Sequence, residues 1–313
     1  MSVFNSNKLR EPVFVKSDSY SEVQLTQLKS LLENVDDSVK DNLQYDIKCL
    51  EKGLVGEKAI EFELKNSHIP MYVLHDVFLE HDGLTAQIDY IVITKSGVHI
   101  IECKNLYGNI TVNADGSFVR SVNDKGRTYK EGIYSPLTQN NRHLELIKAI
   151  RVSQQTNFIQ KKLVEKNFYD YFHSVVVLAN SKTILNDKYA KKEVKQQIIR
   201  CDQLVEYIRK WNQEISEVNE FNDKLMKEYA DMFMRISKNP TVDYTEKYKD
   251  KISNETYEKI AVENNAVTDN ETIFCPVCGS PMVKRVAKRG NNIGNEFYGC
   301  TQFPKCRGII QIK

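Results

Sequence analysis

The stretch AQIDYIVITKSGVHIIECK, residues 86–104, decides the fold of this chain. It contains two apolar runs rich in β-branched residues, 86–94 and 98–104, which are typical of buried strands. Residues 95–97, Lys-Ser-Gly, separate them and form a typical hairpin turn. The sequence therefore predicts two strands that pair as an antiparallel hairpin.

Two carboxylates and a lysine lie at the end of this hairpin that is far from its turn. Pairing through the turn brings Asp89 and Glu102 together there, and Glu102 and Lys104 share one face of their strand. Converging carboxylates favour Mg²⁺ or Mn²⁺, which can polarise a phosphate and activate a bound water, while the lysine positions that water or stabilises negative charge. The alternative is an ordinary strand end, because acid-x-lysine triplets are common. Charges beside such apolar runs are nevertheless costly unless they are used or solvated.

The flanking sequence alternates between strand and helix patterns. Helices are expected over 51–65, from Ser135-Pro136, and over 201–211, and further strands over 71–79, 109–112, 117–122 and 174–179. This order predicts an α/β fold in which a mixed sheet is flanked by helices.

The chain of 313 residues is long enough for one large core and a smaller module. The expected division is a helical extension over 1–50, an α/β domain over 51–211, a charged and partly helical linker over 212–272, and a C-terminal module over 273–313. The extension either covers the sheet or pairs with a second subunit, which would make the protein a homo-oligomer.

Composition and cysteine spacing indicate the compartment and the kind of partner. The 44 basic and 42 acidic residues give a net charge of +2, so a surface for a polyanion must be local. No signal peptide or run long enough to span a membrane is expected. Three cysteines are isolated and four are clustered, which favours metal binding in a reducing, cytoplasmic location over disulfides.

The clustered cysteines predict a structural zinc site. Cys275 and Cys278 form one pair, and Cys300 and Cys306 form the other, which is the thiolate arrangement of a tetrahedral zinc ribbon. A module of this size has too little core to fold alone, so the metal must contribute on the order of 10 kcal/mol.

Cations and aromatic residues surround these cysteines in a composition suited to single-stranded DNA. The expected DNA-binding residues are Lys284, Arg285, Lys288, Arg289, Phe297, Tyr298, Lys305 and Arg307. In the alternative interpretation the aromatics form the small core and the cations only solvate it, and Phe303 is expected in that core. The string CPVCGSPMVKR…FYGCTQFPKCRGII resembles the C-terminal zinc ribbons of bacterial type I topoisomerases, which implies single-stranded DNA binding without catalysis.

Residues 50–179 resemble the nuclease-related domain (NERD) of the PD-(D/E)xK nuclease superfamily. The motifs read GLVGE at 53–57, QID at 87–89, IECKNLYG at 101–108 and SPLTQ at 135–139. Ser135 replaces the usual asparagine, and Cys103 replaces a residue that is often small or β-branched.

The resemblance implies an endonuclease-like fold with Asp89, Glu102 and Lys104 as the catalytic core. It also implies that Glu57 assists the metal from a helix and that Gln139 orients substrate or water. Each has an alternative: Glu57 as a carboxylate favoured by a helix dipole, and Gln139 as a polar residue at a helix start. His75, His81, His99 and His143 are isolated in the sequence and are interpreted as structural, although His143 lies one helical turn beyond Gln139.

Together these features predict a Mg²⁺-dependent deoxyribonuclease, endonuclease or exonuclease, that its zinc ribbon delivers to DNA, in bacterial DNA processing, repair or defence against foreign DNA such as phage. The sequence has no ATP-binding loop, so a helicase would have to be a separate partner. The alternatives are a non-catalytic DNA-binding protein that keeps a nuclease-like scaffold, and an accessory to a topoisomerase.

Overall fold

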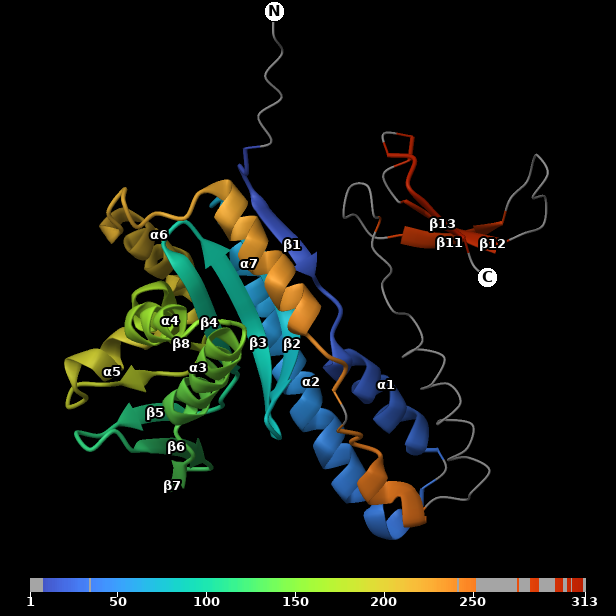
Figure 1. Cartoon of the computed structure of the whole chain (residues 1–313). Coiled ribbons are helices and arrows are strands. Elements are labelled where there is room, and N and C mark those ends of the chain that lie inside the picture. Colours follow the sequence, from blue (N-terminus) through green and yellow to red (C-terminus); the bar gives the residue numbers. More distant parts are fainter. Residues whose placement is uncertain are drawn as a thin grey trace, which may run out of the picture. The chain divides into compact units, whose positions relative to one another are not determined.

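The computed structural model describes residues 8–33, 35–240 and 242–251, and, nearer the C-terminus, residues 275, 282–286, 296–300, 303–304 and 306–311 (Figure 1). The chain divides into two compact units, Met1–Ile252 and Ser253–Lys313. In the described residues no helix is long and apolar enough to cross a membrane.

A six-stranded mixed sheet forms the centre of the first unit, in the order β1-β2-β3-β4-β8-β10. The strands are β1 (Pro12–Lys16), β2 (Met71–His81), β3 (Leu84–Thr94), β4 (Gly97–Lys104), β8 (Phe172–Leu178) and β10 (Ile198–Arg200). β2, β3 and β4 are antiparallel, whereas β8 pairs in parallel with both β4 and β10. The predicted hairpin is confirmed, because Thr94 pairs with Gly97 across its turn.

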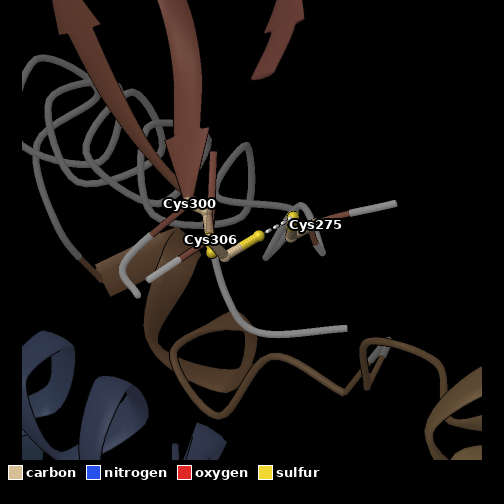
Figure 2. A group of neighbouring side chains, drawn as sticks. All are labelled: Cys275, Cys300 and Cys306. Carbon is tan, nitrogen blue, oxygen red and sulfur yellow. Dashed lines mark hydrogen bonds between the residues drawn. The ribbon is translucent and has the colours of Figure 1, made fainter. Parts of the chain in front are cut away.

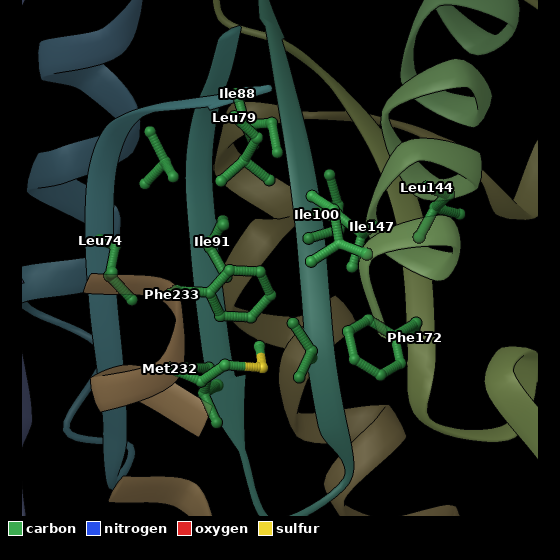
Figure 3. Close-up of a cluster of buried hydrophobic side chains, with 14 of the residues drawn as sticks. Leu74, Leu79, Ile88, Ile91, Ile100, Leu144, Ile147, Phe172, Met232 and Phe233 are labelled. Carbon is green, nitrogen blue, oxygen red and sulfur yellow. The ribbon is translucent and has the colours of Figure 1, made fainter. Parts of the chain in front are cut away.

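Helices cover both faces of this sheet, as the sequence predicts. On one face, α2 (Asp37–Lys65) and α6 (Leu204–Glu214) contribute buried side chains to a cluster on β2, β3, β4 and β8. On the other face, α3 (Pro136–Ser153), α4 (Phe158–Tyr171) and α7 (Asp223–Ile236) pack on a second cluster. Figure 3 shows this second cluster, in which α3 and α7 cover the apolar residues of β2, β3 and β4.

A second sheet of four strands, in the order β7-β6-β5-β9, adjoins the centre. Its strands are β5 (Asn109–Val112), β6 (Phe118–Asp124), β7 (Arg127–Ile133) and β9 (Leu185–Asn186). β5 and β6 were predicted. β7 was not, because its sequence RTYKEGI has charged and polar residues on both faces and lacks the apolar alternation of a half-buried strand.

The N-terminal residues differ from the expected helical extension. They begin with β1, which pairs in parallel with β2, and continue with α1 (Tyr20–Leu31). α2 begins at Asp37 instead of residue 51, because Val39, Leu43 and Ile47 continue the buried stripe of its second half. The extension therefore shares the central sheet.

The segment after α7 was expected to be linker, but residues 237–251 pack on the first unit. The Lys238 N–H donates to the Phe78 carbonyl at 2.9 Å, and the Tyr244 N–H donates to Gln24 Oε1 at 2.7 Å. The smaller helical elements are α5 (Lys192–Gln196) and two 3₁₀ helices, η1 (Cys201–Gln203) and η2 (Glu246–Lys251).

The second unit contains an antiparallel three-stranded ribbon. Its strands are β11 (Met282–Val286), β12 (Glu296–Cys300) and β13 (Ile309–Gln311), with β12 in the middle.

Candidate nuclease-like site and zinc ribbon

The β3–β4 hairpin places Asp89 and Glu102 at the same end of two adjacent strands. The regular pairing ends at Tyr90 and Ile101, one residue before each carboxylate. Beyond that pair, Asp89 Oδ2 accepts a hydrogen bond of 2.6 Å from the Cys103 N–H. Asp89 and Glu102 therefore lie at the same end of the hairpin, as predicted. Beyond the Tyr90–Ile101 pair, the side-chain carboxylate of Asp89 takes the place of a backbone carbonyl in joining the two strands.

Glu102, Lys104 and Gln139 form a continuous polar chain. Lys104 Nζ lies 2.6 Å from Glu102 Oε1 and donates to Gln139 Oε1 at 3.1 Å. Glu102 is 2% exposed, so its charge depends on these partners instead of on water. Of the five residues named by the resemblance, the structure thus brings Asp89, Glu102 and Lys104 together, and Gln139 contacts Lys104.

Helix α3 is fixed against the sheet by a buried amide. Ser135 caps the helix, because its hydroxyl accepts from the Thr138 N–H at 3.3 Å. One turn further, Asn140 is fully buried and donates to the carbonyls of Ile100 at 2.9 Å and Val175 at 3.1 Å. These bonds set the position of Gln139, the adjacent residue.

Glu57 reaches the site because α2 approaches β4 closely at Gly56. A Cβ on Gly56 would lie 2.7 Å from Asn105 Cβ and 3.1 Å from Cys103 Sγ, so a glycine is required for this approach. Cys103 lies on the α2 face of β4, opposite to Glu102, and belongs to the apolar packing there, as expected.

His75 is a partner of the site that the sequence interpretation missed. Its Nε2 lies 2.8 Å from Glu57 Oε2, and its ring stacks on Tyr90 with centroids 4.6 Å apart. The Tyr90 hydroxyl in turn donates to the Glu57 carbonyl at 3.0 Å. The pairing of His75 with Tyr90 across β2 and β3 creates this contact, and no local motif signals it.

His143 also lies at the site, on the turn of α3 after Gln139. Its Nδ1 is 3.7 Å from Glu102 Oε2. Burial and the charge of Lys104 lower the pKa of His143 to about 4, so the imidazole is neutral at pH 7. The spacing from Gln139 is the one signal in the sequence that pointed to it.

Asp76 is a buried carboxylate of β2 that the sequence interpretation did not identify. It is buried on β2, has φ of +52°, and receives bonds from Gln87 Nε2 at 2.7 Å and from the Tyr20 N–H at 2.5 Å. Tyr20 is the first residue of α1, so Asp76 joins the N-terminal helix to the β2–β3 ladder.

The electrostatics of the site favour a bound cation. Removal from water, together with the charges of Glu102 and Glu57, raises the pKa of Asp89 well above its ordinary range. Desolvation also raises the pKa of Glu102, against the opposing effect of Lys104. Burial disfavours the charged form of Lys104, but the adjacent Glu102 outweighs this effect and raises its pKa. A positive ion between the carboxylates would relieve their repulsion.

The oxygen atoms present fit a divalent cation held by two carboxylates. Glu102 Oε2 is buried and, within the described part of the chain, has no hydrogen-bond partner, although buried oxygens nearly always have one. Among the described residues, three ligand atoms within 4.8 Å of one another occur only in the cysteine cluster, so Glu57 is not part of a compact three-carboxylate set. Mg²⁺ commonly binds through one or two carboxylates and retains its waters, which matches Asp89 with Glu102.

Two further histidines are buried away from these residues. His173 stacks on Trp211 with centroids 3.8 Å apart and lies beside His99. Burial lowers the pKa of His173 to about 4, against smaller opposing effects of the Ser96 carbonyl and of Asp170. His99 was expected to be structural, and its burial beside His173 agrees with that expectation.

The ribbon brings three of the four predicted zinc ligands together, as Figure 2 shows. Cys275, Cys300 and Cys306 are buried, and Cys275 Sγ lies 3.6 Å from Cys306 Sγ. That separation is too long for a disulfide, and it is close to the roughly 3.8 Å between two thiolates that share a tetrahedral zinc ion. Cys278 lies outside the described residues.

The predicted DNA-binding residues of the ribbon have different environments. Lys284 forms an ion pair with Glu296 at 2.6 Å, and an Arg285 nitrogen donates to the Cys300 carbonyl at 3.5 Å. Tyr298 packs against the buried cysteine cluster, as in the alternative interpretation, whereas Phe297 is half-buried and Arg307 is exposed. Lys288, Arg289 and Lys305 lie outside the described residues.

Phe303 corrects one expectation. It was expected in the core of the ribbon, but its side chain is 59% exposed. The buried cluster of the described ribbon residues consists of three cysteines and Met282, so the metal-binding side chains take the place that an aromatic core would occupy.

The fold and the sites define the class of the chain: an α/β protein with a buried carboxylate–lysine site, followed by a cysteine ribbon. Comparison with known families agrees with both parts. The nuclease-related domain matches residues 52–179, and the topoisomerase DNA-binding C4 zinc finger matches residues 272–313. The chain therefore carries these two domains, as predicted; the first indicates a nuclease-related function, and the second indicates DNA binding and a structural Zn²⁺ ion.

One curated relative and one solved structure are similar to parts of the chain. An uncharacterized protein of Bacillus anthracis is 35% identical over 113 residues, which are 33% of this chain and 48% of the relative. The chain thus spans about half the length of that relative. Can2 of Sulfobacillus thermosulfidooxidans, solved with cyclic tetra-adenylate, matches 61% of this chain and 50% of its own at 10% identity, with a TM-score of 0.25.

Proposed function

We propose that this chain is a metal-dependent nuclease that cleaves DNA phosphodiester bonds and that its zinc ribbon binds single-stranded DNA. The observation that carries the proposal is the buried Glu102 oxygen without a hydrogen-bond partner. It lies on a carboxylate already paired with Lys104, and the adjacent strand carries a second carboxylate, Asp89. A divalent cation would satisfy that oxygen, because His143 Nδ1, at 3.7 Å, is too far for a hydrogen bond and Lys104 pairs with the other oxygen.

Each residue has a distinct role in the proposed reaction. Asp89 and Glu102 hold the divalent ion, which when bound polarises the phosphate and lowers the pKa of a bound water. Lys104 lies beside the carboxylates and donates to the negative charge that develops on the phosphoryl oxygens. Gln139 holds the Lys104 ammonium in place through its bond of 3.1 Å.

Glu57 and His143 orient the site from the two covering helices. Glu57 is bonded to His75 and raises the pKa of Asp89 by its charge, so it favours cation binding from a distance. Neutral His143 faces Glu102 Oε2 and restricts where that oxygen can move. The same chemistry serves DNA processing, repair and defence against foreign DNA.

Cleavage assays on labelled single- and double-stranded DNA test this proposal, with Mg²⁺, Mn²⁺ or EDTA. Glu102→Gln and Lys104→Ala should each reduce the rate at least about 100-fold, because the first weakens the cation site and the second removes the positive charge beside the developing phosphoryl charge. Glu80→Gln is the matched control, because Glu80 also pairs with a lysine, Lys238 at 3.1 Å, but on the surface. It should keep full activity.

Cleavage that persists in EDTA, or in both site variants, would exclude this site as the catalytic centre. DNA binding without cleavage in any metal would instead support the non-catalytic scaffold. Removal of residues 273–313 should weaken DNA binding and reduce its salt dependence, because phosphate contacts release counterions. An unchanged salt slope would exclude the ribbon as a DNA-binding element.

A further inference from the structure

The hairpin of β6 and β7 is inserted between two elements that carry the site. β5 begins five residues after Lys104, and α3 begins three residues after the end of β7 at Ile133. We call residues 118–133 the arm. Each of its strands has seven residues and is about 20 Å long, and only its base joins the apolar packing, through Phe118 and Ile133. Figure 1 shows the arm beside α3.

The structural role of the arm does not explain all of its exposed residues. Six of the seven residues of β7 are exposed, and β7 is the outer strand of its sheet. An outer strand usually carries charge to prevent pairing with another chain, and Lys130 and Glu131 fit that role. An exposed tyrosine does not fit that role, because its ring adds apolar surface at an edge where charged residues prevent pairing with another chain.

Tyrosines are the large apolar side chains that the arm and its borders expose. In the fully described segment 105–134, the exposed large apolar residues are Tyr107, Tyr129 and Tyr134, which are 57–60% exposed. No leucine, isoleucine, valine or phenylalanine of this segment is exposed to a similar extent. A protein-binding patch has an apolar centre of aliphatic and aromatic side chains, which this segment lacks.

Cations alternate with these rings. Arg127 is two residues from Tyr129 on the same face of β7, Lys130 follows on the other face, and Arg142 lies over the Tyr134 ring at 5.7 Å. Among the described residues, no ion pair involves Arg127 or Lys130, whereas Arg120 is paired with Glu131. The charges that remain available on β7 are therefore positive.

We infer that the arm and the adjoining Tyr134 form a binding surface for single-stranded DNA, on which Tyr129 and Tyr134 stack on bases while Arg127, on the same face of β7 as Tyr129, contacts phosphates. Exposed rings next to unpaired cations suit unstacked bases, because in a duplex the faces of the bases are covered by their neighbours. The inference takes its substrate class, DNA, from the proposed function. It adds that the nuclease-like unit engages a single strand itself, independently of the ribbon.

The test uses the full chain with a short 5-iodouracil-containing oligonucleotide and no added Mg²⁺ or Mn²⁺, so that binding is read without cleavage and the ribbon keeps its zinc. Photo-crosslinks mapped by mass spectrometry should include Tyr129 or Tyr134. Tyr129→Ala should weaken binding of the oligonucleotide by about 5- to 100-fold, and Tyr129→Phe should retain it, because stacking needs the ring and not the hydroxyl. Tyr189→Ala is the matched control, since Tyr189 is 66% exposed and follows β9, at the other edge of the same sheet.

Crosslinks confined to the ribbon, or equal affinities of Tyr129→Ala and Tyr189→Ala, would overturn the inference. A change of self-association in Tyr129→Ala with unaltered DNA binding would do the same and would identify a second copy of the chain as the occupant. Crosslinks to the arm in a protein that cleaves no DNA would refute the nuclease and leave the arm assignment intact. Cleavage that depends on Glu102, in a protein that gives no crosslinks to the arm, would refute the arm assignment and leave the nuclease proposal intact.

Discussion

Two glycines of α2, three residues apart, provide a direct test of how Glu57 is positioned. An added Cβ at Gly53 meets nothing within 4 Å, whereas at Gly56 it meets Asn105 Cβ at 2.7 Å and Ala179 Cβ at 3.2 Å. Alanine at either position adds helix propensity worth about 1 kcal/mol. At Gly56 this gain is opposed by an overpacking cost of about 1–3 kcal/mol.

Gly53→Ala should therefore stabilise the first unit by about 1 kcal/mol, and Gly56→Ala should leave it unchanged or up to about 2 kcal/mol less stable. The neighbour at Gly56 cannot yield easily, because Asn105 is itself fixed to α2 by a bond of 2.6 Å from its Nδ2 to the Lys52 carbonyl. Urea unfolding measures the difference between the free energies of unfolding of the two variants, and this difference isolates the steric cost at Gly56. Each kcal/mol of this difference corresponds to about 2–4 °C in Tm for a unit of this size.

Activity should follow the same order. Gly56→Ala moves α2 away from β4 and carries Glu57 with it, so cleavage should fall, whereas Gly53→Ala should cleave as wild type. If Gly56→Ala were as stable and as active as Gly53→Ala, the close approach of helix and strand would not be what positions Glu57, and the reasoning would be refuted.

Three further predictions concern other parts of the chain. Asn140→Ala should lower the free energy of unfolding by about 1–3 kcal/mol in urea, because two buried carbonyls lose their donor; a loss below about 0.5 kcal/mol would contradict the role of that amide. Because the pKa of His173 is lowered to about 4, its contribution to stability is complete above about pH 6.5 and is lost as the pH falls towards 4. Unfolding free energy should then drop by up to about 3 kcal/mol over that interval, and a His173→Phe variant with the same pH profile would show that another group is responsible. Cys300→Ser should remove zinc, measured by mass spectrometry of the metal, without altering the unfolding of the first unit; full zinc content would exclude Cys300 as a ligand.

The sequence by itself determined the parts of this protein in which local pattern and chemistry agree. The two apolar runs in 86–104 and the turn between them indicated a hairpin, and the turn fixed its register, so Asp89 and Glu102 had to lie at one end. Cysteine spacing likewise indicated the ribbon, because four cysteines in two close pairs form the ligand pattern of a tetrahedral zinc ion.

Tertiary structure alone decided the surroundings of those residues. His75 lies on β2 and His143 on α3, and only the packing of α2 and α3 on the sheet brings them to Glu57 and Glu102. β7 has no apolar face of its own, and its strand conformation comes from hydrogen bonds to β6. A sequence pattern reports which face of an element is buried, but contacts between elements far apart in the chain depend on how those faces pack, and that is a property of the whole fold.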